Sequence, residues 1–167
     1  DVTFLVVEGP RYRIKSIRIE HVDARGEPVK TAPLYSADEI QKELKAKPGE
    51  FYDHGRLQRD WLGIQEFYGR RGHPASSFPG MEKDPTASRV YYPPREIYGV
   101  EPEVAIVVQV YEGVPKNLRD VVIRGNQYTR DAVIRRRFRV APGERVDMKE
   151  VGRSQRNLDQ SRYFNDP

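Results

Sequence analysis

Val110-Tyr-Glu-Gly-Val-Pro-Lys-Asn-Leu-Arg-Asp-Val-Val-Ile-Arg-Gly-Asn126 decides the fold, because the chain holds an earlier copy, Val6-Val-Glu-Gly-Pro-Arg-Tyr-Arg-Ile-Lys-Ser-Ile-Arg-Ile19. A shift of 104 residues brings Glu8–Gly9 onto Glu112–Gly113. In each copy the Glu-Gly pair ends one apolar run, since glycine readily adopts a positive φ, and a second apolar run follows. A strand-to-strand junction that occurs twice indicates a repeated structural unit.

The composition bounds the fold more than the function. The chain has 167 residues, of which 37% are hydrophobic and 32% charged, and this suits one or two small domains with much surface. No apolar run approaches the length of a membrane-spanning helix. The chain starts at Asp1 without an initiator methionine or a signal peptide, so we expect an excised piece of a longer protein. The absence of cysteine does not discriminate between compartments.

Positive charge is concentrated in the C-terminal part. Residues 117–167 hold 12 Arg and Lys against 7 Asp and Glu, whereas residues 1–116 hold 17 against 18. Such a surface could attract nucleic acid, acidic headgroups or an acidic protein face. A solvated helix face is the favoured interpretation, because no aromatic residues alternate with the basic ones as they do in single-strand binders.

The first unit begins with strands. Period-2 alternation predicts a strand over residues 2–8 that is apolar on both faces, and a second strand over residues 12–19. Ile17 and Ile19 share one face of the second strand and Ile14 is out of phase with them. This mismatch predicts a β-bulge near Lys15.

Two helices follow a polar loop over residues 21–34. Ser36–Glu39 is a capping box for a short helix, which buries Ile40 and Leu44 and stops at Lys47–Glu50. A longer amphipathic helix follows Asp53, with its apolar stripe at Leu57, Trp61, Ile64 and Tyr68. We expect Trp61 to anchor the core, so that Trp61→Ala costs roughly 3–5 kcal/mol.

Residues 75–100 are the least regular part. Ala75–Met81 is expected to form a short strand that Arg89–Tyr92 continues. The three tyrosines in residues 91–98 are interpreted either as an exposed loop or as side chains folded onto a sheet edge. Val104, Ile106, Val108 and Val110 then line one face of a strong strand.

The second unit repeats this order but stops early. It has an expected strand over Leu118–Arg124, Thr129 as N-cap, and a helix carrying Ile134 and Phe138. A shift of 94 residues brings Pro48–Glu50 onto Pro142–Glu144 and Asp53 onto Asp147. A second amphipathic helix carries Val151 and Leu158 and ends at Arg162-Tyr163-Phe164, so the last two strands are absent.

These motifs, in this order and twice, resemble the polypeptide-transport-associated (POTRA) domains of BamA-like outer-membrane β-barrel assembly proteins. The resemblance implies an α+β fold of β-α-α-β-β repeats, each a three-stranded mixed sheet with two helices on one face. Residues 1–9 would be the last strand of a preceding repeat, residues 10–114 a complete domain, and residues 115–167 a partial one (β-α-α).

The resemblance also implies a function. It predicts a periplasmic module that binds unfolded outer-membrane proteins and accessory lipoproteins by β-augmentation, in a parent chain with further repeats and a membrane β-barrel. An unpaired sheet edge suits such clients because it binds main chain without demanding particular side chains. The predicted binding edge comprises Ser76, Ser77, Phe78, Val90, Tyr91 and Tyr92. The predicted inter-domain hinge comprises Gly113, Val114 and Pro115.

One further expectation concerns self-association. The strand at residues 2–8 and the strand at residues 118–124 each lack a partner strand in the expected fold. We predict that residues 2–8 of one copy pair with residues 118–124 of another.

Other functions have less support. His21, His54 and His73 lack metal-site spacing, and no nucleophile or phosphate-loop motif occurs, so neither an enzyme nor a cofactor is expected. A basic RNA-binding module would depend on Arg135–Arg139, but no nucleic-acid partner is expected. The closer alternatives place the same domain in a two-partner secretion transporter, an organelle import pore or a division protein.

Overall fold

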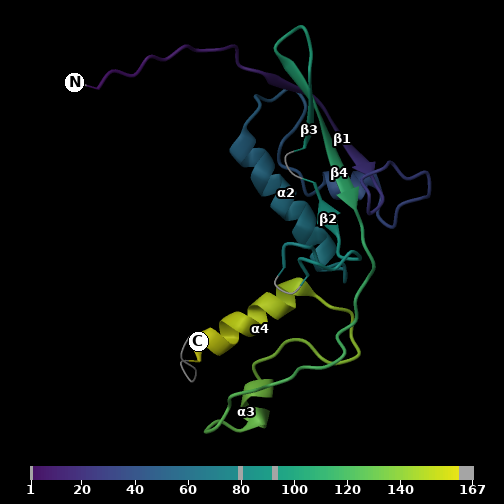
Figure 1. Cartoon of the computed structure of the whole chain (residues 1–167), viewed down its shortest axis with the longest axis vertical. Coiled ribbons are helices and arrows are strands. Elements are labelled where there is room, and N and C mark those ends of the chain that lie inside the picture. Colours follow the sequence, from purple (N-terminus) through teal and green to yellow (C-terminus); the bar gives the residue numbers. More distant parts are fainter. Residues whose placement is uncertain (1, 79–80, 92–93, 162–167) are drawn as a thin grey trace.

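The computed structural model describes residues 2–78, 81–91 and 94–161. The predicted first unit, residues 10–114, contains two long strands, β1 (Arg13–His21) and β4 (Glu103–Tyr111), which pair in parallel along their length. In Figure 1 the helices of the predicted second unit, α3 (Asp131–Arg135) and α4 (Met148–Gln160), lie beyond the end of β4 that is far from the N-terminal segment. The N-terminal segment extends away from both units (Figure 1).

The sheet is mixed and has four strands, with β4 at its centre. The short strands β2 (Arg89–Val90) and β3 (Arg95–Tyr98) both pair antiparallel with β4. Because β1 occupies one edge of β4, β2 and β3 must share the other edge. The sheet is therefore three strands wide, as the resemblance implies, but its third position is divided between two short strands.

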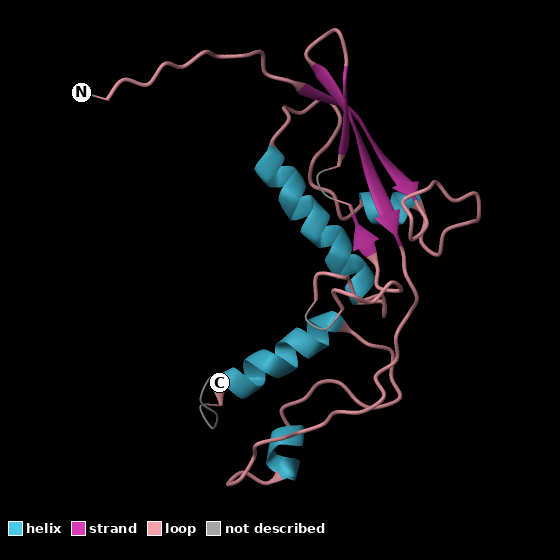
Figure 2. Cartoon of the chain, viewed as in Figure 1, coloured by secondary structure: helices cyan, strands magenta, loops and turns pink. Residues whose placement is uncertain are grey.

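Two of the four described helices, α1 (Ala37–Gln41) and α2 (His54–Gly69), pack against this sheet and share one core with it (Figure 2). Helix α1 has the predicted capping box, and helix α2 is capped by the Asp53 carboxylate, which accepts from the Arg56 N–H at 3.0 Å. The predicted bulge is confirmed, because the register of β1 against β4 shifts between Ile14 and Ser16. This shift lets Ile14 and Ile17 both reach the core despite their odd spacing.

The core lies between α1, α2 and the facing side of β1 and β4. Its largest fully buried side chains are Tyr68 and Phe67, which stack edge-to-face with centroids 5.4 Å apart. The prediction that Trp61 anchors the core is wrong. Trp61 is only partly buried and packs against the rim of the core, because its indole Nε1 donates to the Val90 carbonyl at 2.5 Å. Phe67 was not predicted as a core residue, because the predicted apolar stripe of this helix already included its neighbour Tyr68.

The second unit repeats the first in its hydrogen bonds. In the first unit Ile14 N donates to Glu50 O at 2.8 Å and accepts from Gly49 N at 2.7 Å through its carbonyl. In the second unit Leu118 makes the same two bonds with Glu144 O and Gly143 N, at 2.8 and 2.7 Å. Both glycines have a φ near +90°. The two Pro-Gly-Glu turns are thus structurally equivalent, as the shift of 94 residues predicts.

Two helices complete the described part of the second unit, α3 (Asp131–Arg135) and α4 (Met148–Gln160). The Asp147 carboxylate caps α4 by accepting from the N–H groups of Lys149 and Glu150. Asp147 thus repeats the role of Asp53, as the shift of 94 residues predicts. The N-cap of α3 is Arg130, without a side-chain bond, so the prediction of Thr129 as N-cap is wrong.

Three expected strands are absent from the described chain. Residues 2–8 and 118–124 are not in strands, and Ala75 makes only an isolated bridge to Ser88 before a turn. An isolated strand leaves its backbone groups unpaired, so it forms only where a neighbouring strand accepts it. In the first unit β4 provides that neighbour for β1, whereas no described residue after α4 provides one for residues 118–124.

The two Glu-Gly junctions also differ. Gly113 has a φ of +67°, whereas Gly9 lies in an exposed segment without a positive φ. The expected equivalence of these junctions therefore does not appear in this structure. None of the described helices combines the length and apolar character needed to cross a membrane. The predicted Arg162-Tyr163-Phe164 helix end lies outside the described residues.

Candidate polypeptide-binding edge

The backbone N–H and C=O groups of successive residues in β4 point alternately to its two sides. This alternation decides which backbone groups of the sheet remain available to bind an added strand. Val22 N donates to Val110 O at 2.9 Å, and Tyr91 N donates to Gln109 O at 3.0 Å. Even-numbered residues of β4 therefore bond to β1, and odd-numbered residues bond to β2 and β3. It follows that Val90, Glu96 and Tyr98, which lie opposite even-numbered residues, direct their backbone N–H and C=O groups outward.

The outer edge is closed beside β2. Ser88 N donates to Pro74 O and Ser88 O accepts from Ser76 N, both at 3.0 Å, so the 74–76 segment covers this end. The Val90 carbonyl accepts the Trp61 indole N–H. Helix α2 therefore uses its only tryptophan to cap a backbone acceptor on an edge strand.

The outer edge is open beside β3. Gly99 N donates to Glu103 O at 3.0 Å, and this bond fixes the alternation, so the backbone groups of Glu96 and Tyr98 point away from β4. Within the described part of the chain these outward groups have no partner. Ile97 and Tyr98 are 48% and 53% exposed, so the open backbone carries apolar side chains on both faces.

The side chains at this edge are held in place. The Glu96 carboxylate accepts from the Tyr98 hydroxyl at 2.5 Å and from the Tyr52 hydroxyl. The bond to Glu96 raises the pKa of Tyr98. Tyr12 packs edge-to-face on Tyr98, with ring centroids 5.0 Å apart. The open edge is thus a fixed surface and not a frayed end.

The opposite edge of the sheet, along β1, is covered at both of its ends. Residues 49–52 bond to its start, and Val29 N donates to His21 O at 3.0 Å near its end. Between these two covers, Ile17 and Ile19 direct their backbone groups outward, so this opening has the same number of outward residues as the β3 edge. Helix α1 also packs against β1. The β3 edge is consequently the better candidate for binding an added strand.

The structure separates the residues predicted to bind partners. Ser77 is exposed, and its hydroxyl donates to Gln65 Oε1 at 3.1 Å. Phe78 lines a cavity of about 350 Å³ between α2 and α4, together with Met148. Val90 is buried, Tyr91 is half-buried, and Tyr92 lies outside the described residues. Sequence reasoning missed Glu96–Tyr98 because the Pro-containing stretch before them hid the strand.

The predicted hinge is bonded to the first unit on both sides of Pro115. Val114 N donates to Thr86 O at 2.8 Å, and Lys116 N donates to Gly72 O at 2.7 Å. The Lys116 ammonium lies 2.8 Å from the Asp84 carboxylate, and this bond and those from Thr86 lower the pKa of Asp84. The hinge remains a prediction, and motion there would have to break these bonds.

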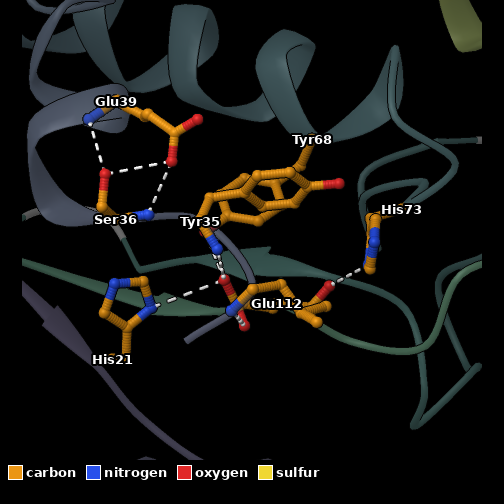
Figure 3. A network of polar contacts seen from close by, with 8 residues as sticks. His21, Tyr35, Ser36, Glu39, Tyr68, His73 and Glu112 are labelled. Carbon is orange, nitrogen blue, oxygen red and sulfur yellow. Dashed lines mark hydrogen bonds and ion pairs between the residues drawn. The ribbon is translucent and has the colours of Figure 1, made fainter. Parts of the chain in front are cut away.

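Glu112, which follows β4, connects three parts of the first unit (Figure 3). Its carboxylate accepts from Leu34 N at 2.9 Å, Tyr35 N at 3.3 Å and the Tyr68 hydroxyl at 3.1 Å. Its backbone carbonyl lies 2.8 Å from His73 Nδ1. The glutamate of the Glu-Gly motif therefore fixes the end of the long loop and the end of α2 to the sheet. Burial and this carboxylate raise the pKa of Tyr68.

The burial of His21 predicts that the stability of the first unit depends on pH. Its ring is 12% exposed, and its Nδ1 lies 3.7 Å from Glu112 Oε1 (Figure 3). Burial lowers the pKa of His21, and the Glu112 carboxylate offsets this only in part. As the pH decreases below about 6.5, the unfolded chain therefore takes up a proton at His21 more readily than the folded chain does. The free energy of unfolding of the first unit consequently decreases as the pH is lowered.

We therefore expect the midpoint of thermal unfolding to fall as the pH drops from neutral through about 6. His21→Phe should flatten this part of the pH profile, and His54→Gln, at an exposed histidine, should keep it. Circular dichroism melts at several pH values measure both. An unchanged slope in His21→Phe would contradict the assignment.

The basic run at residues 135–139 lies against α4. Asn157 Nδ2 donates to Arg137 O at 3.1 Å and the Ser154 hydroxyl accepts from Arg139 N at 2.8 Å. Arg135, Arg136, Arg137 and Arg139 are exposed. Among the described residues no group of three or more His, Asp or Glu side chains could hold a metal ion.

Comparison with protein families tests these observations. The POTRA family model, described as surface antigen variable number repeat, matches residues 12–113 and again residues 117–166. This chain belongs to the POTRA family. The two matched ranges correspond to the two units that share the hydrogen-bond pattern around Ile14 and Leu118.

Individual proteins agree with the POTRA assignment. The outer membrane protein assembly factor BamA of Nitratidesulfovibrio vulgaris is 26% identical over 165 residues, and a relative from Treponema pallidum is 23% identical over 163. Each alignment covers 98% of this chain, which spans only 18% and 17% of the respective relatives. These POTRA units are therefore similar to a small part of much longer proteins.

Solved structures share the POTRA fold. Haemophilus influenzae BamA POTRA3-5 superimposes with a TM-score of 0.68 at 18% identity, covering 95% of this chain and 54% of that one. BamA from Haemophilus ducreyi lacking POTRA domains 1-3 gives 0.71 at 20% identity, covering 93% and 25%. At this identity the likeness establishes the α+β fold and its repeat.

Proposed function

We propose that this chain is a periplasmic, non-enzymatic part of a BamA-like outer-membrane assembly factor and binds extended polypeptides by β-augmentation at the β3 edge. Its clients would be unfolded outer-membrane proteins and accessory lipoproteins, and its parent chain would carry further POTRA repeats and a membrane β-barrel. The open backbone of Glu96 and Tyr98 is the observation that carries the proposal.

The chemistry of the edge supports this kind of client. A bound strand would exchange main-chain hydrogen bonds with Glu96 and Tyr98, and these bonds are the same for any sequence. Ile97 and Tyr98 lie on opposite faces of β3, so they would contact alternate side chains of the added strand. Strands of membrane β-barrels alternate between apolar and polar residues, and therefore offer an apolar contact on one face.

The proposed site lies on the neighbouring strand β3 and not within the predicted edge at residues 76–92. The β2 part of the predicted edge already bonds to Trp61 and to the 74–76 segment, so a client could add there only by displacing them. The adjacent β3 edge needs no displacement. Two-partner secretion transporters and organelle import pores remain alternative parents for the same edge, and the sequence of the parent chain would discriminate between them.

Removing one outward N–H tests the proposal. Tyr98→Pro should weaken the binding of a β-barrel strand peptide by about 3- to 10-fold, because proline deletes one main-chain donor worth about 1 kcal/mol. Proline is tolerated at a position that bonds to nothing within the sheet. Fluorescence anisotropy with a labelled peptide measures the change.

Tyr98→Ala is the matched control, since it removes the same side chain but keeps the N–H. If both variants weaken binding equally, the side chain and not the backbone is responsible. Hydrogen exchange gives a second readout, because bound peptide should protect the amides of Glu96 and Tyr98. Peptide binding that leaves both amides unprotected would refute the β3 edge as the site.

A further inference from the structure

A cavity of about 350 Å³ lies where helices α2 and α4 meet. In Figure 1 these helices form two arms of a V, with the start of α4 beside the end of α2. The residues that line the cavity come from both units. Its volume falls within the range of pockets that take small molecules, about 300–1,000 Å³. The cavity is therefore large enough to be a ligand site, and it is separate from the β3 edge.

Glycines at the end of α2 hold the two walls of the cavity at a set spacing. A Cβ at Gly69 would lie 3.3 Å from the Met148 Cβ, so the start of α4 packs closely on the α2 backbone. A Cβ at Gly72 would lie 2.3 Å from the Arg145 Cγ, so this side chain also needs a glycine beneath it. Lys116 N donates to Gly72 O at 2.7 Å. Because these contacts fix α4 against α2, the cavity is preformed.

The lining combines an apolar floor with a basic rim. The floor consists of Phe78 and Met148, which are both half-buried. The rim carries three cations, one from α2 and two from α4, namely Arg70, Lys149 and Arg156. Glu66 is the one carboxylate of the lining. Three cations and one carboxylate give the lining a net charge of +2.

The three cations retain capacity to bind an anion. Arg70 Nε is buried and has no hydrogen-bond partner among the described residues, although Arg70 Nη2 lies 3.4 Å from Glu43 Oε2. Lys149 and Arg156 are exposed, and neither forms an ion pair with a described residue. A buried donor without a partner is destabilising, and a charged acceptor is the group that satisfies it best. The rim consequently favours a ligand with several anionic oxygens.

We propose that this cavity binds a phosphate monoester carried on a short apolar chain. Such a phosphate has a charge of about −1.5 to −2 at pH 7 and three acceptor oxygens, which match the net charge and the three cations of the rim. A carboxylate has one charge and two oxygens, so it would leave one cation unpaired. The apolar chain would lie on Phe78 and Met148, because a thioether adapts to chains of different shape. The site does not depend on the peptide-binding proposal, since it uses no residue of the β3 edge.

Isothermal titration calorimetry with octyl phosphate, below the concentration at which it forms micelles, tests the proposal. Saturable binding to a single site is expected. Inorganic phosphate lacks the apolar chain and octyl glucoside lacks the charge, so each should bind at least about 10-fold more weakly. Octanoate should bind with intermediate affinity. No binding of octyl phosphate overturns the proposal, as does equal affinity for octyl phosphate and either of the two partial ligands.

Two charge variants should change the affinity in opposite directions. Arg156→Gln should weaken octyl phosphate binding by about 3- to 10-fold, because it removes a charged donor from the rim. Glu66→Gln should strengthen binding by about 2- to 5-fold, because it removes the carboxylate that repels the phosphate. Arg136→Gln is the matched control: Arg136 is exposed and lies outside the lining, so the affinity should stay within about 2-fold of the parent. Changes in the same direction for Arg156→Gln and Glu66→Gln would contradict the proposed site.

A blocking variant tests the location. A Cβ at Gly152 would meet only Arg156 Nη1, at an ordinary contact distance of 3.5 Å, and glycine is unfavourable inside a helix, so α4 should accept a side chain here. Gly152→Phe should fill the cavity and weaken binding at least about 10-fold, while circular dichroism shows no loss of helix. In the parent protein, octyl phosphate should shift the amide resonances of Lys149 and Gly152 and leave those of the β3 edge unchanged. Unaltered binding in Gly152→Phe would refute the site.

Discussion

Tyr68→Ala is expected to lower the free energy of unfolding of the first unit by about 3–5 kcal/mol. Tyr68 is fully buried, contacts Phe67 and Tyr35 edge-to-face, and donates its hydroxyl to Glu112. Removing the ring leaves a cavity in the centre of the core. A loss of this size is a large part of the stability of a small domain, so the urea midpoint should fall steeply.

Two companion variants separate the causes. Tyr68→Phe keeps the ring but leaves Glu112 without one donor, so it should cost about 1.5–3 kcal/mol, the value of a hydrogen bond to a charged group. Trp61→Ala should cost less than Tyr68→Ala, because Trp61 packs at the rim of the core. If Trp61→Ala proves the more damaging change, our assignment of the core centre is wrong.

Gly113→Ala is expected to destabilise the first unit by about 2–5 kcal/mol. Its φ of +67° costs an L-residue about 1–2 kcal/mol. A Cβ there would also lie 2.6 Å from Thr86 O and 2.7 Å from Ser88 N, which are backbone atoms that cannot rotate away. Relieving this overlap costs typically a further 1–3 kcal/mol. Urea unfolding followed by circular dichroism measures the change.

Gly9→Ala is the natural control, because Gly9 holds the equivalent place in the sequence repeat. A Cβ at Gly9 would meet nothing within 4 Å, so the variant should unfold like the parent. If Gly9→Ala destabilises the isolated chain, then residues 2–9 are packed in solution.

The local features that the sequence predicted correctly all depend on neighbours in the chain. The Ser36–Glu39 capping box, the Asp53 and Asp147 caps and the bulge near Lys15 are confirmed. Each follows from hydrogen bonds or periodicity within a few residues. The repeat is confirmed as well, because its turns and caps recur at fixed spacing.

The incorrect predictions involve partners that are distant in sequence. Residues 2–8 and 118–124 have good strand patterns and form no strand, since a strand needs a neighbour that periodicity cannot supply. Trp61 has the sequence pattern of a core residue, but its indole N–H donates to the Val90 carbonyl and its ring packs at the rim of the core. The same contact closes one part of the edge, so only Glu96 and Tyr98 remain open.

By itself, then, the sequence determined the family, the order of elements, the caps and the twofold repeat, because these depend on residue types at short and recurring spacings along the chain. Only the tertiary structure decided which backbone groups of the sheet remain unpaired, where Glu112 binds and that Pro115 is flanked by bonds to the first unit. Hydrogen bonds between segments far apart in the chain settle those questions, and a pattern of apolar residues does not specify which segments meet.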